Sequence, residues 1–379
     1  MRIVHVVTRL LRAGSEENTL ACCHWQARAG HEVVLVHGAE VDESAAGDLP
    51  FRVIGVPEMV HPLRPLADLR ALGALRQLYR ELQPEVIHTH QSKAGVLGRM
   101  AADVVPGARV VHGVHMLPWA HVGPLRRRVY LAAERAVARR TDVFVGVSHA
   151  LGEAYAQAGI SRRMTCVRSG MALGRFRGAE MPEDWREMLR LGDFEARPPV
   201  AVMLAAMEPR KRHLPFLRAF AEVRRLMPDL RIVLAGAGPL EARVRQEVAR
   251  LGLGDRVVVA GHRRDPERLL ALADLSLLTS EREGLPRVVV QSLAAGVPVL
   301  VNDLPGIAEV LRDGVNGRVL PARDAGAVVR DMVGLLRVPE RLERLRRGAV
   351  ATDVSAWALE RLGPETTALY GAVRARAAA

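Results

Sequence analysis

The sequence predicts an α/β protein made of two doubly wound, Rossmann-like domains that face a cleft. β-Branched runs alternate with helical segments along the chain, which is the pattern of parallel sheets covered by helices. The alternation stops once, at a polar, proline-containing stretch at residues 177–198, and the chain of 379 residues exceeds what one hydrophobic core usually supports. We therefore expect an N-terminal domain at 1–176 and a C-terminal domain at 199–355, joined by that linker.

The first half opens with the β-branched strand 2–7, a loop, a helix at about 16–28 and a second strand at 30–37, which together form a βαβ unit. The same order then repeats. The further expected strands are 51–56, 86–88, 108–112, 143–147 and 164–168, and the further expected helices are 66–82, 94–103 and 124–140.

The second half repeats the alternation. Its expected strands are 200–205, 230–235, 257–260, 273–280, 297–301 and 317–320, and its expected helices are 214–226, 240–251, 307–312, 325–336 and 339–347. The tail at 356–379 is expected to be helical and to pack back on the N-terminal domain.

The composition fits two aliphatic cores and a basic surface. Hydrophobic residues make up 49% of the chain and aromatic residues 4%, while the formal net charge is +12. Such a charge suits nucleic acid, an anionic membrane or phosphorylated ligands. A genome of high GC content, which encodes arginine on solvated faces, would explain it equally well.

The cysteines and the apolar runs predict a cytoplasmic protein. Cys22, Cys23 and Cys166 have the spacing of neither a disulfide framework nor a metal site. No apolar run approaches the ~20 residues of a membrane span, and the N-terminus enters a strand without a signal sequence. We therefore expect a protein that is not exported and does not cross a membrane.

The segment 281–298, EREGLPRVVVQSLAAGVP, has the composition of a ligand-binding loop. It lies between two short buried strands, and in an open α/β sheet such loops lie at the carboxyl ends of the strands, where ligands bind. Gly284 lets the backbone approach a ligand, the following helix start attracts an anion, and Glu283 can accept hydrogen bonds from hydroxyls. A sugar nucleotide offers both an anionic diphosphate and hydroxyls.

Other polar or glycine-containing motifs follow further expected strands. They are Gly14 in AGSE, HTHQSKAG at 88–95, VVHGVHM at 110–116, EPRK at 208–211, GAGP at 236–239, GHRRD at 261–265 and NDLPG at 302–306. Taken singly, the glycine turns predict only entries into helices.

In this order the motifs resemble the retaining glycosyltransferases of family 4, which have the GT-B fold, across nearly the whole chain. The segment 88–95 is similar to that of enzymes that build surface polysaccharide or lipopolysaccharide on lipid carriers. The resemblance implies transfer of a hexosyl or N-acetylhexosaminyl group from a nucleoside-diphosphate sugar to a saccharide acceptor, expected to be lipid-linked.

The family signature is a glutamate, seven residues and a second glutamate. Glu283 keeps the first, and Gln291 replaces the second. The resemblance implies that Glu283 and His115 hold the donor sugar, that Lys211 stabilises the leaving diphosphate, and that Gln291 contacts the ribose. Met116 stands where the family usually has glycine.

Ala206 stands where the family has a second diphosphate-binding cation, an arginine. We expect Arg210 or Arg212 to replace it. Further donor-side residues that the resemblance implies are Gly14, Gly236, Gly238, His262, Arg263, Gly284, Leu285 and Pro286. The acceptor-side residues that it implies are His90, Ser92 and Lys93.

The resemblance implies no cofactor and no metal ion, and it favours UDP over GDP as the nucleotide of the co-substrate. No Asp-x-Asp motif ends a suitable strand, so fixed cations would replace a metal in stabilising the diphosphate.

The expected helix 124–140 interleaves arginines with apolar residues. Such a helix can lie on the anionic inner face of the cell membrane, where a lipid-linked acceptor would be found. An ordinary packed helix with a solvated arginine face is the simpler interpretation. Aromatic residues suited to base stacking are missing, so we expect no nucleic-acid partner.

Two other functions stay open at this stage. Gln291, Ala206 and Met116 together also fit a non-catalytic binding or scaffold protein with the GT-B fold. A sugar-nucleotide epimerase on the same fold would differ in forming product from the donor without an acceptor.

Overall fold

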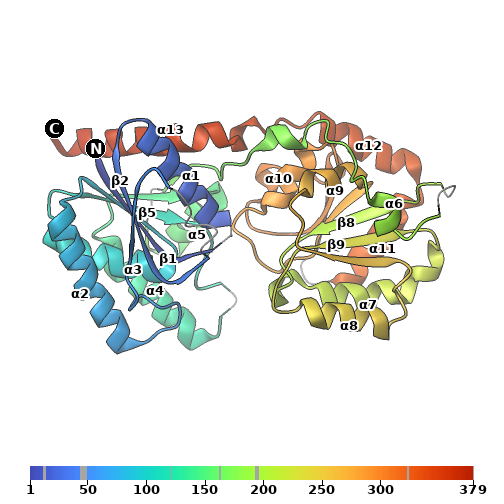
Figure 1. The fold of residues 1–379 in the computed structure, drawn as a ribbon, viewed down its shortest axis with the longest axis horizontal. Helices are drawn as coiled ribbons and strands as arrows, with labels where there is room; N and C mark the ends of the chain where they lie inside the picture. Colours follow the sequence, from blue (N-terminus) through green and yellow to red (C-terminus); the bar gives the residue numbers. More distant parts are fainter. Residues whose placement is uncertain are drawn as a thin grey trace. The chain divides into compact units, whose positions relative to one another are not determined.

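The computed structural model describes residues 1–11, 14–42, 49–120, 122–161, 164–192, 196–321 and 324–378 (Figure 1). The chain forms two compact units. The first comprises Met1–Gly170 together with Trp357–Ala379, and the second comprises Met171–Ala356.

The described part of the first unit contains a parallel sheet with the strand order β3-β2-β1-β4-β5-β6-β7. The strands are β1 (Arg2–Leu10), β2 (Glu32–Val41), β3 (Arg52–Gly55), β4 (Val86–His90), β5 (Arg109–Val114), β6 (Val143–Gly146) and β7 (Met164–Cys166). The helices are α1 (Gly14–Arg28), α2 (Pro65–Leu82), α3 (Ser92–Ala101), α4 (Pro124–Ala138), α5 (His149–Gln157) and α13 (Leu359–Ala378).

Helices cover both faces of this sheet, which makes the unit doubly wound (Figure 1). Val4 and Val6 of β1 pack toward α2 and α3, while Ile3, on the other face of the same strand, packs in a cluster with residues of α1 and α13. His5 shares the face of Ile3, because side chains alternate along a strand. The tail helix α13 therefore completes the core of the first unit.

The described part of the second unit contains a parallel sheet with the order β10-β9-β8-β11-β12-β13. The strands are β8 (Val200–Leu204), β9 (Arg231–Ala235), β10 (Val257–Gly261), β11 (Leu275–Leu278), β12 (Val299–Asn302) and β13 (Gly317–Leu320). The helices are α6 (Trp185–Met188), α7 (His213–Val223), α8 (Glu241–Arg250), α9 (Pro266–Leu272), α10 (Arg287–Ala294), α11 (Ala325–Leu336) and α12 (Pro339–Val350).

Two doubly wound units confirm the fold class that the strand and helix pattern predicts. The pattern did not predict α5 or α9, and the expected helix 307–312 is only the 3-10 turn Ile307–Glu309. The expected linker 177–198 also differs, because α6 lies within it and Leu189 is fully buried against the second sheet. Short helices with few apolar residues give little periodic signal, and burial of a polar stretch depends on its neighbours.

A buried ion pair fixes α3, the helix that follows β4. Arg99 is completely buried, and its Nη2 lies 2.7 Å from Glu134 Oε2 on α4. Its Nε donates to the Gly95 carbonyl at 2.7 Å, and the guanidinium lies 5.7 Å from the centre of the Phe144 ring. The pair ties α3 to α4 and so holds the polar start of α3 in place.

Replacing Glu134 by alanine leaves the Arg99 charge buried without a counter-charge. We expect Glu134→Ala to lower the free energy of unfolding by about 3–5 kcal/mol, measured by urea unfolding followed by circular dichroism. The control is Glu153→Ala, at an exposed position of α5, which should stay within about 0.5 kcal/mol of wild type. Equal effects of the two substitutions would show that the ion pair does not anchor α3.

Candidate active site

Both sheets contain one point at which the strand order reverses. In the first unit it lies between β1 and β4, and in the second it lies between β8 and β11. Ligands of doubly wound proteins bind outside the carboxyl ends of the strands at such a point. Polar side chains of the predicted site gather at both places.

In the second unit, the reversal brings two distant loops together. Lys211 ends a 3-10 turn after β8, and Glu283 lies in the loop between β11 and α10, 72 residues further along the chain. The Glu281 amide donates to the Arg210 carbonyl at 2.9 Å, and the Thr279 hydroxyl donates to the Lys211 carbonyl at 2.7 Å. These bonds fix the two loops against each other.

Glu283 is held by two cations. Lys211 Nζ lies 2.6 Å from its Oε1, and Arg210 Nη1 lies 3.0 Å from both of its carboxylate oxygens. Arg210 Nε also donates to Glu208 Oε2 at 2.7 Å. Arg212 pairs with Glu281 instead. Of the two arginines considered as replacements for the cation missing at 206, Arg210 is the one that lies beside Lys211 and Glu283.

The environment of Glu283 keeps its carboxylate ionised. Burial acts to raise the pKa of Glu283, since its side chain is only 11% exposed, but the charges of Lys211 and Arg210 outweigh burial and lower the pKa below its ordinary value. An ionised carboxylate has lone pairs left over for hydroxyl donors. The neighbouring cations can bind phosphate oxygens.

Two glycines of the loop between β9 and α8 pack closely on the segment that leads to Lys211. Gly236 and Gly238 have φ of +146° and +157°, and a Cβ on Gly236 would lie 2.1 Å from the Ala205 carbonyl oxygen. A Cβ on Gly238 would lie 2.7 Å from the Met207 carbonyl oxygen. Any larger residue would separate the loops, so glycine is required at both positions.

The turn before α10 has the predicted form. Gly284 and Leu285 are buried, and Pro286 precedes the first helical residue. Gln291 is half-buried on α10. Asn302 at the end of β12 donates to the Thr279 and Ser280 carbonyls at 2.9 and 3.2 Å, and so supports the loop that carries Glu283.

Arg263 is engaged by carboxylates rather than left open to a ligand. Its guanidinium contacts Asp265 at 2.7 Å and Asp184 at 2.9 Å, and hydrogen bonds to both raise its pKa. The neighbouring His262 is exposed. A donor contact for either residue stays a prediction.

In the first unit, His90 is the residue of the acceptor-side motif that the structure shows in contact with His115. His90 lies inside β4 rather than after it, and its Nδ1 is 3.3 Å from Nε2 of His115, which follows β5. Lys93 is nearly buried and pairs with Asp68 at 2.6 Å, so its charge is already balanced. Ser92 is the first residue of α3.

Gly14, the remaining predicted residue of the first unit, begins α1. In the same unit the structure identifies a polar residue that the motifs did not single out. Gln91 has φ of +64°, which is rare for a residue other than glycine. Its side chain accepts from the Thr8 amide at 3.0 Å and donates to Glu16 Oε1 at 2.8 Å. Strained backbone of this kind gathers at functional sites. Its sequence signal is a polar residue between a buried strand and a helix.

The second unit contains another residue that the motifs did not indicate. His213 begins α7, two residues after Lys211, and is 1% exposed. Burial, with a smaller effect of Lys211, lowers its pKa to about 4. Neither ring nitrogen has a hydrogen-bond partner within the described ranges. A neutral imidazole therefore lies beside the cations.

The two sheets, with their polar loops at the reversal points, define a nucleotide-binding α/β protein of the GT-B class. Residues 13–170 match the family described as "Glycosyl transferase 4-like domain", and residues 190–351 match "Glycosyl transferases group 1". The two matches cover most of both halves. The chain belongs to the family 4 type of glycosyltransferases and uses a nucleotide sugar, as the order of motifs predicted.

Known relatives extend over most of the chain. The UDP-Gal:alpha-D-GlcNAc-diphosphoundecaprenol alpha-1,3-galactosyltransferase of Escherichia coli is 25% identical over 76% of this chain and 75% of its own. The GDP-mannose-dependent alpha-(1-6)-phosphatidylinositol monomannoside mannosyltransferase of Mycolicibacterium smegmatis is 28% identical over 85% of this chain and 83% of its own. Anabaena HepE, solved with UDP-glucose, has a TM-score of 0.80 at 19% identity, covering 98% of this chain and all of its own, and shows the same fold.

The lowered pKa of Glu283 predicts a pH-dependent contribution to stability. In the unfolded chain a glutamate has its ordinary pKa of about 4.3. The ion pairs of Glu283 therefore stabilise the folded chain above that pH, and this stabilisation is lost as the pH falls through the lowered pKa of Glu283 in the folded chain. We expect the difference in unfolding free energy between wild type and Glu283→Gln to be large at pH 6 and to shrink below about pH 4. The control Glu343→Gln, at an exposed position of α12, should show no such change. A difference for Glu283→Gln that is independent of pH would contradict the prediction.

Proposed function

We propose that the protein is a retaining glycosyltransferase that moves a hexosyl or N-acetylhexosaminyl group from a nucleoside-diphosphate sugar to a lipid-linked saccharide in the synthesis of a cell-surface polysaccharide or lipopolysaccharide. The observation that carries this proposal is the group formed by Glu283, Lys211 and Arg210 at the strand reversal of the second unit. It combines an ionised acceptor for sugar hydroxyls with two cations for phosphate oxygens.

In this proposal, Glu283 accepts hydrogen bonds from hydroxyls of the donor sugar and so orients its anomeric carbon. Its contacts to Lys211 and Arg210 hold the carboxylate in one position before the ligand arrives. Such preorganisation avoids reordering the site during the reaction. Gln291 contacts the ribose through its amide, which both donates and accepts hydrogen bonds.

Breaking the bond between the sugar and the diphosphate leaves extra negative charge on the departing phosphate. Lys211 and Arg210 stabilise that charge, and the amides that start α10 add to the effect. No side chain is required as a nucleophile. The acceptor hydroxyl attacks from the side that the diphosphate leaves, its proton passes to the departing phosphate oxygen, and the anomeric configuration is kept.

The nucleotide is proposed to be UDP, in line with the Escherichia coli relative and with HepE, whereas the mycobacterial relative uses GDP-mannose. The acceptor is proposed to be lipid-linked because the same Escherichia coli relative acts on a diphosphoundecaprenol-linked sugar. We propose no resident cofactor and no metal ion, since Lys211 and Arg210 supply the positive charge.

Sugar transfer should depend on Glu283 and Lys211. With UDP- or GDP-sugars and a lipid-linked saccharide, we expect release of nucleoside diphosphate in EDTA. Lys211→Ala should lower the rate about 10²–10³-fold because one fixed cation is lost, and Glu283→Ala should lower kcat/KM by about 10–100-fold.

The matched control is Arg218→Ala, on an exposed arginine of α7 that pairs with Glu247, and it should leave the rate unchanged. Nuclear magnetic resonance of the product should show the anomeric configuration of the donor. An inverted product would exclude retention. Absence of nucleotide release with every donor tested would favour a binding protein, and product formed without acceptor would indicate an epimerase.

We further propose that α4 contacts an anionic membrane surface. Residues 124–129 at its start are all exposed, with Leu125 and Val129 at 73% and 51% beside three arginines. Within the described ranges, no helix is long and apolar enough to span a bilayer. Binding at the surface through exposed arginines and apolar side chains would bring the enzyme to a lipid-linked acceptor.

Charge reversal on α4 tests this contact. The triple substitution of Arg126, Arg127 and Arg128 by glutamate should weaken binding to vesicles with anionic lipid by more than about a hundredfold, since each arginine contributes about 1 kcal/mol near such a surface. Vesicles of neutral lipid serve as the control. Unchanged sedimentation with anionic vesicles would exclude α4 as the contact.

A further inference from the structure

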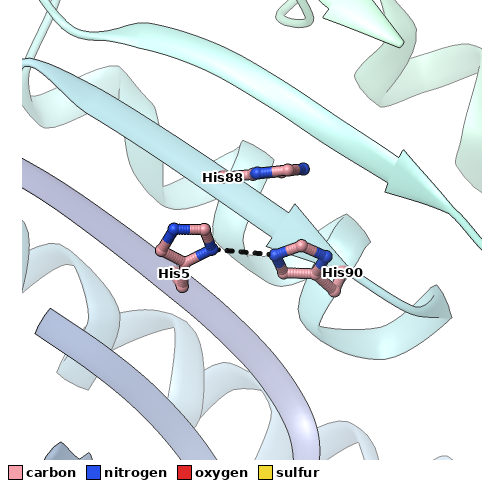
Figure 2. A group of neighbouring side chains, drawn as sticks. All are labelled: His5, His88 and His90. Atoms are coloured by element: carbon pink, nitrogen blue, oxygen red, sulfur yellow. Dashed lines mark hydrogen bonds between the residues drawn. The ribbon is translucent and has the colours of Figure 1, made fainter. Parts of the chain in front are cut away.

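A chain of imidazole rings runs from the core of the first unit to His115. His5 Nε2 lies 2.8 Å from Gln26 Oε1, and His5 Nδ1 lies 3.0 Å from His90 Nε2. His90 Nδ1 in turn lies 3.3 Å from His115 Nε2. Figure 2 shows the hydrogen bond between His5 on β1 and His90 on β4, with the His88 ring beside it. The chain crosses the reversal point between these two strands.

The rings of this chain are neutral. His5 and His90 are 0% and 4% exposed, and burial lowers the pKa of His5 to about 4 and that of His90 well below its ordinary value. Burial also lowers the pKa of His115 to about 4. No carboxylate is hydrogen-bonded to these rings in the part of the chain that the structure describes. A neutral imidazole has one N–H donor and one acceptor nitrogen, so each hydrogen bond determines the next.

Gln26 sets the direction of the chain. Its Nε2 donates to Thr367 Oγ1 of α13 at 3.3 Å, which leaves Oε1 to accept from His5 Nε2–H. His5 Nδ1 must then accept from His90 Nε2–H. His90 Nδ1 must in turn accept from His115 Nε2–H. The proton of His115 therefore faces inward, and its Nδ1 carries only a lone pair.

We infer that Gln26, His5 and His90 are positioning residues that hold His115 as the neutral Nε2–H tautomer, so that Nδ1 accepts a hydrogen bond from a hydroxyl of the bound sugar. His115 is half-buried, and Nδ1 has no partner among the described residues. The contact with a sugar rests on the proposed function. The tautomer itself follows from hydrogen bonds within the first unit and does not depend on the proposed function.

Gly113 provides the space in which the nitrogens meet. A Cβ at this position would lie 2.8 Å from His90 Nδ1, 3.2 Å from His88 Nε2 and 3.4 Å from His115 Nε2. Even alanine would press on the hydrogen bond between His90 and His115. The histidine chain therefore requires glycine near the end of β5.

A metal ion is the alternative occupant of this cluster, since ring nitrogens of His5, His88 and His90 lie within 4.8 Å of one another. An ion needs a lone pair from each ligand. Both nitrogens of His5 and both of His90 are already used in hydrogen bonds, and His88 Nδ1 lies 2.5 Å from the Tyr370 hydroxyl. Only His88 Nε2 lacks a partner among the described side chains. His88 lines a cavity of about 30 Å³, which has room for water.

The tautomer can be measured without substrate. In the EDTA-treated full chain labelled with ¹⁵N-histidine, long-range proton–nitrogen correlation should show His115 with protonated Nε2 and unprotonated Nδ1 at pH 7, assigned by loss of the signals in His115→Gln. Gln26→Met, similar in size but without the amide, should leave His115 a mixture of tautomers. The control is Gln77→Met, the same substitution at an exposed position of α2, which should keep the wild-type pattern.

An Nδ1–H tautomer in wild type, or an unchanged pattern in Gln26→Met, would overturn the inference. Zn²⁺ binding at one ion per chain that shifts all three buried rings would overturn it in favour of a metal site. Circular dichroism of Gln26→Met separates a changed tautomer from a changed fold.

Activity supplies the second measurement. Gln26→Met should lower kcat/KM for sugar transfer about tenfold and Gln77→Met should leave it unchanged, while the Kd of UDP stays unchanged in both. An equal loss in both variants would contradict a positioning role. If wild type transfers no sugar but shows the expected tautomer, the proposed function fails and the assignment of the tautomer stands.

Discussion

The reversal of strand order determines where polar side chains can gather in each unit. At such a point the loops of two neighbouring strands leave toward opposite faces of the sheet, which opens space at the carboxyl ends. Between β8 and β11 this space receives Lys211 and Glu283, which are 72 residues apart. The neighbouring strands β1 and β4 likewise bring together His5, inside β1, and His90, at the end of β4, which are 85 residues apart. Both groups exist only once the parallel sheet has formed.

The two groups meet the demands of burial in opposite ways. Glu283 is ionised because Lys211 and Arg210 balance the cost of burying its charge. His5 and His90 have no hydrogen-bonded carboxylate among the described residues, so they stay neutral and are stabilised by hydrogen bonds. A charged group can bind an anion and its hydroxyls, whereas a neutral chain can only fix which ring nitrogen donates. The chemistry available to each unit follows from this difference.

Much of the fold could be predicted because the strands of a parallel sheet are buried on both faces. Such strands are continuous β-branched, apolar runs that are easily recognised in the sequence. The loop with Glu283 was predicted from residue types that suit sugars and phosphates, and Lys211 was predicted from the family resemblance. The partners of Lys93 and Arg263 could not, because side chains far apart in sequence meet only in the folded unit. His5 did leave a signal, as a polar residue inside the apolar strand RIVHVV, but nothing local indicates that Gln26 would reach it.

Where this chain departs from the family pattern, another residue supplies the positive charge that a diphosphate needs. Ala206 removes one cation, but Arg210 lies beside Lys211. Without a ligand, Glu283 and Glu208 balance the +2 of Lys211 and Arg210, and the two cations bind phosphate oxygens through N–H donors that these ion pairs do not use. Backbone amides at the start of α10, and in the loop that Gly236 and Gly238 allow to pack closely, add to these donors. Gln291, which is uncharged, adds no further negative charge to the site and can still donate and accept hydrogen bonds.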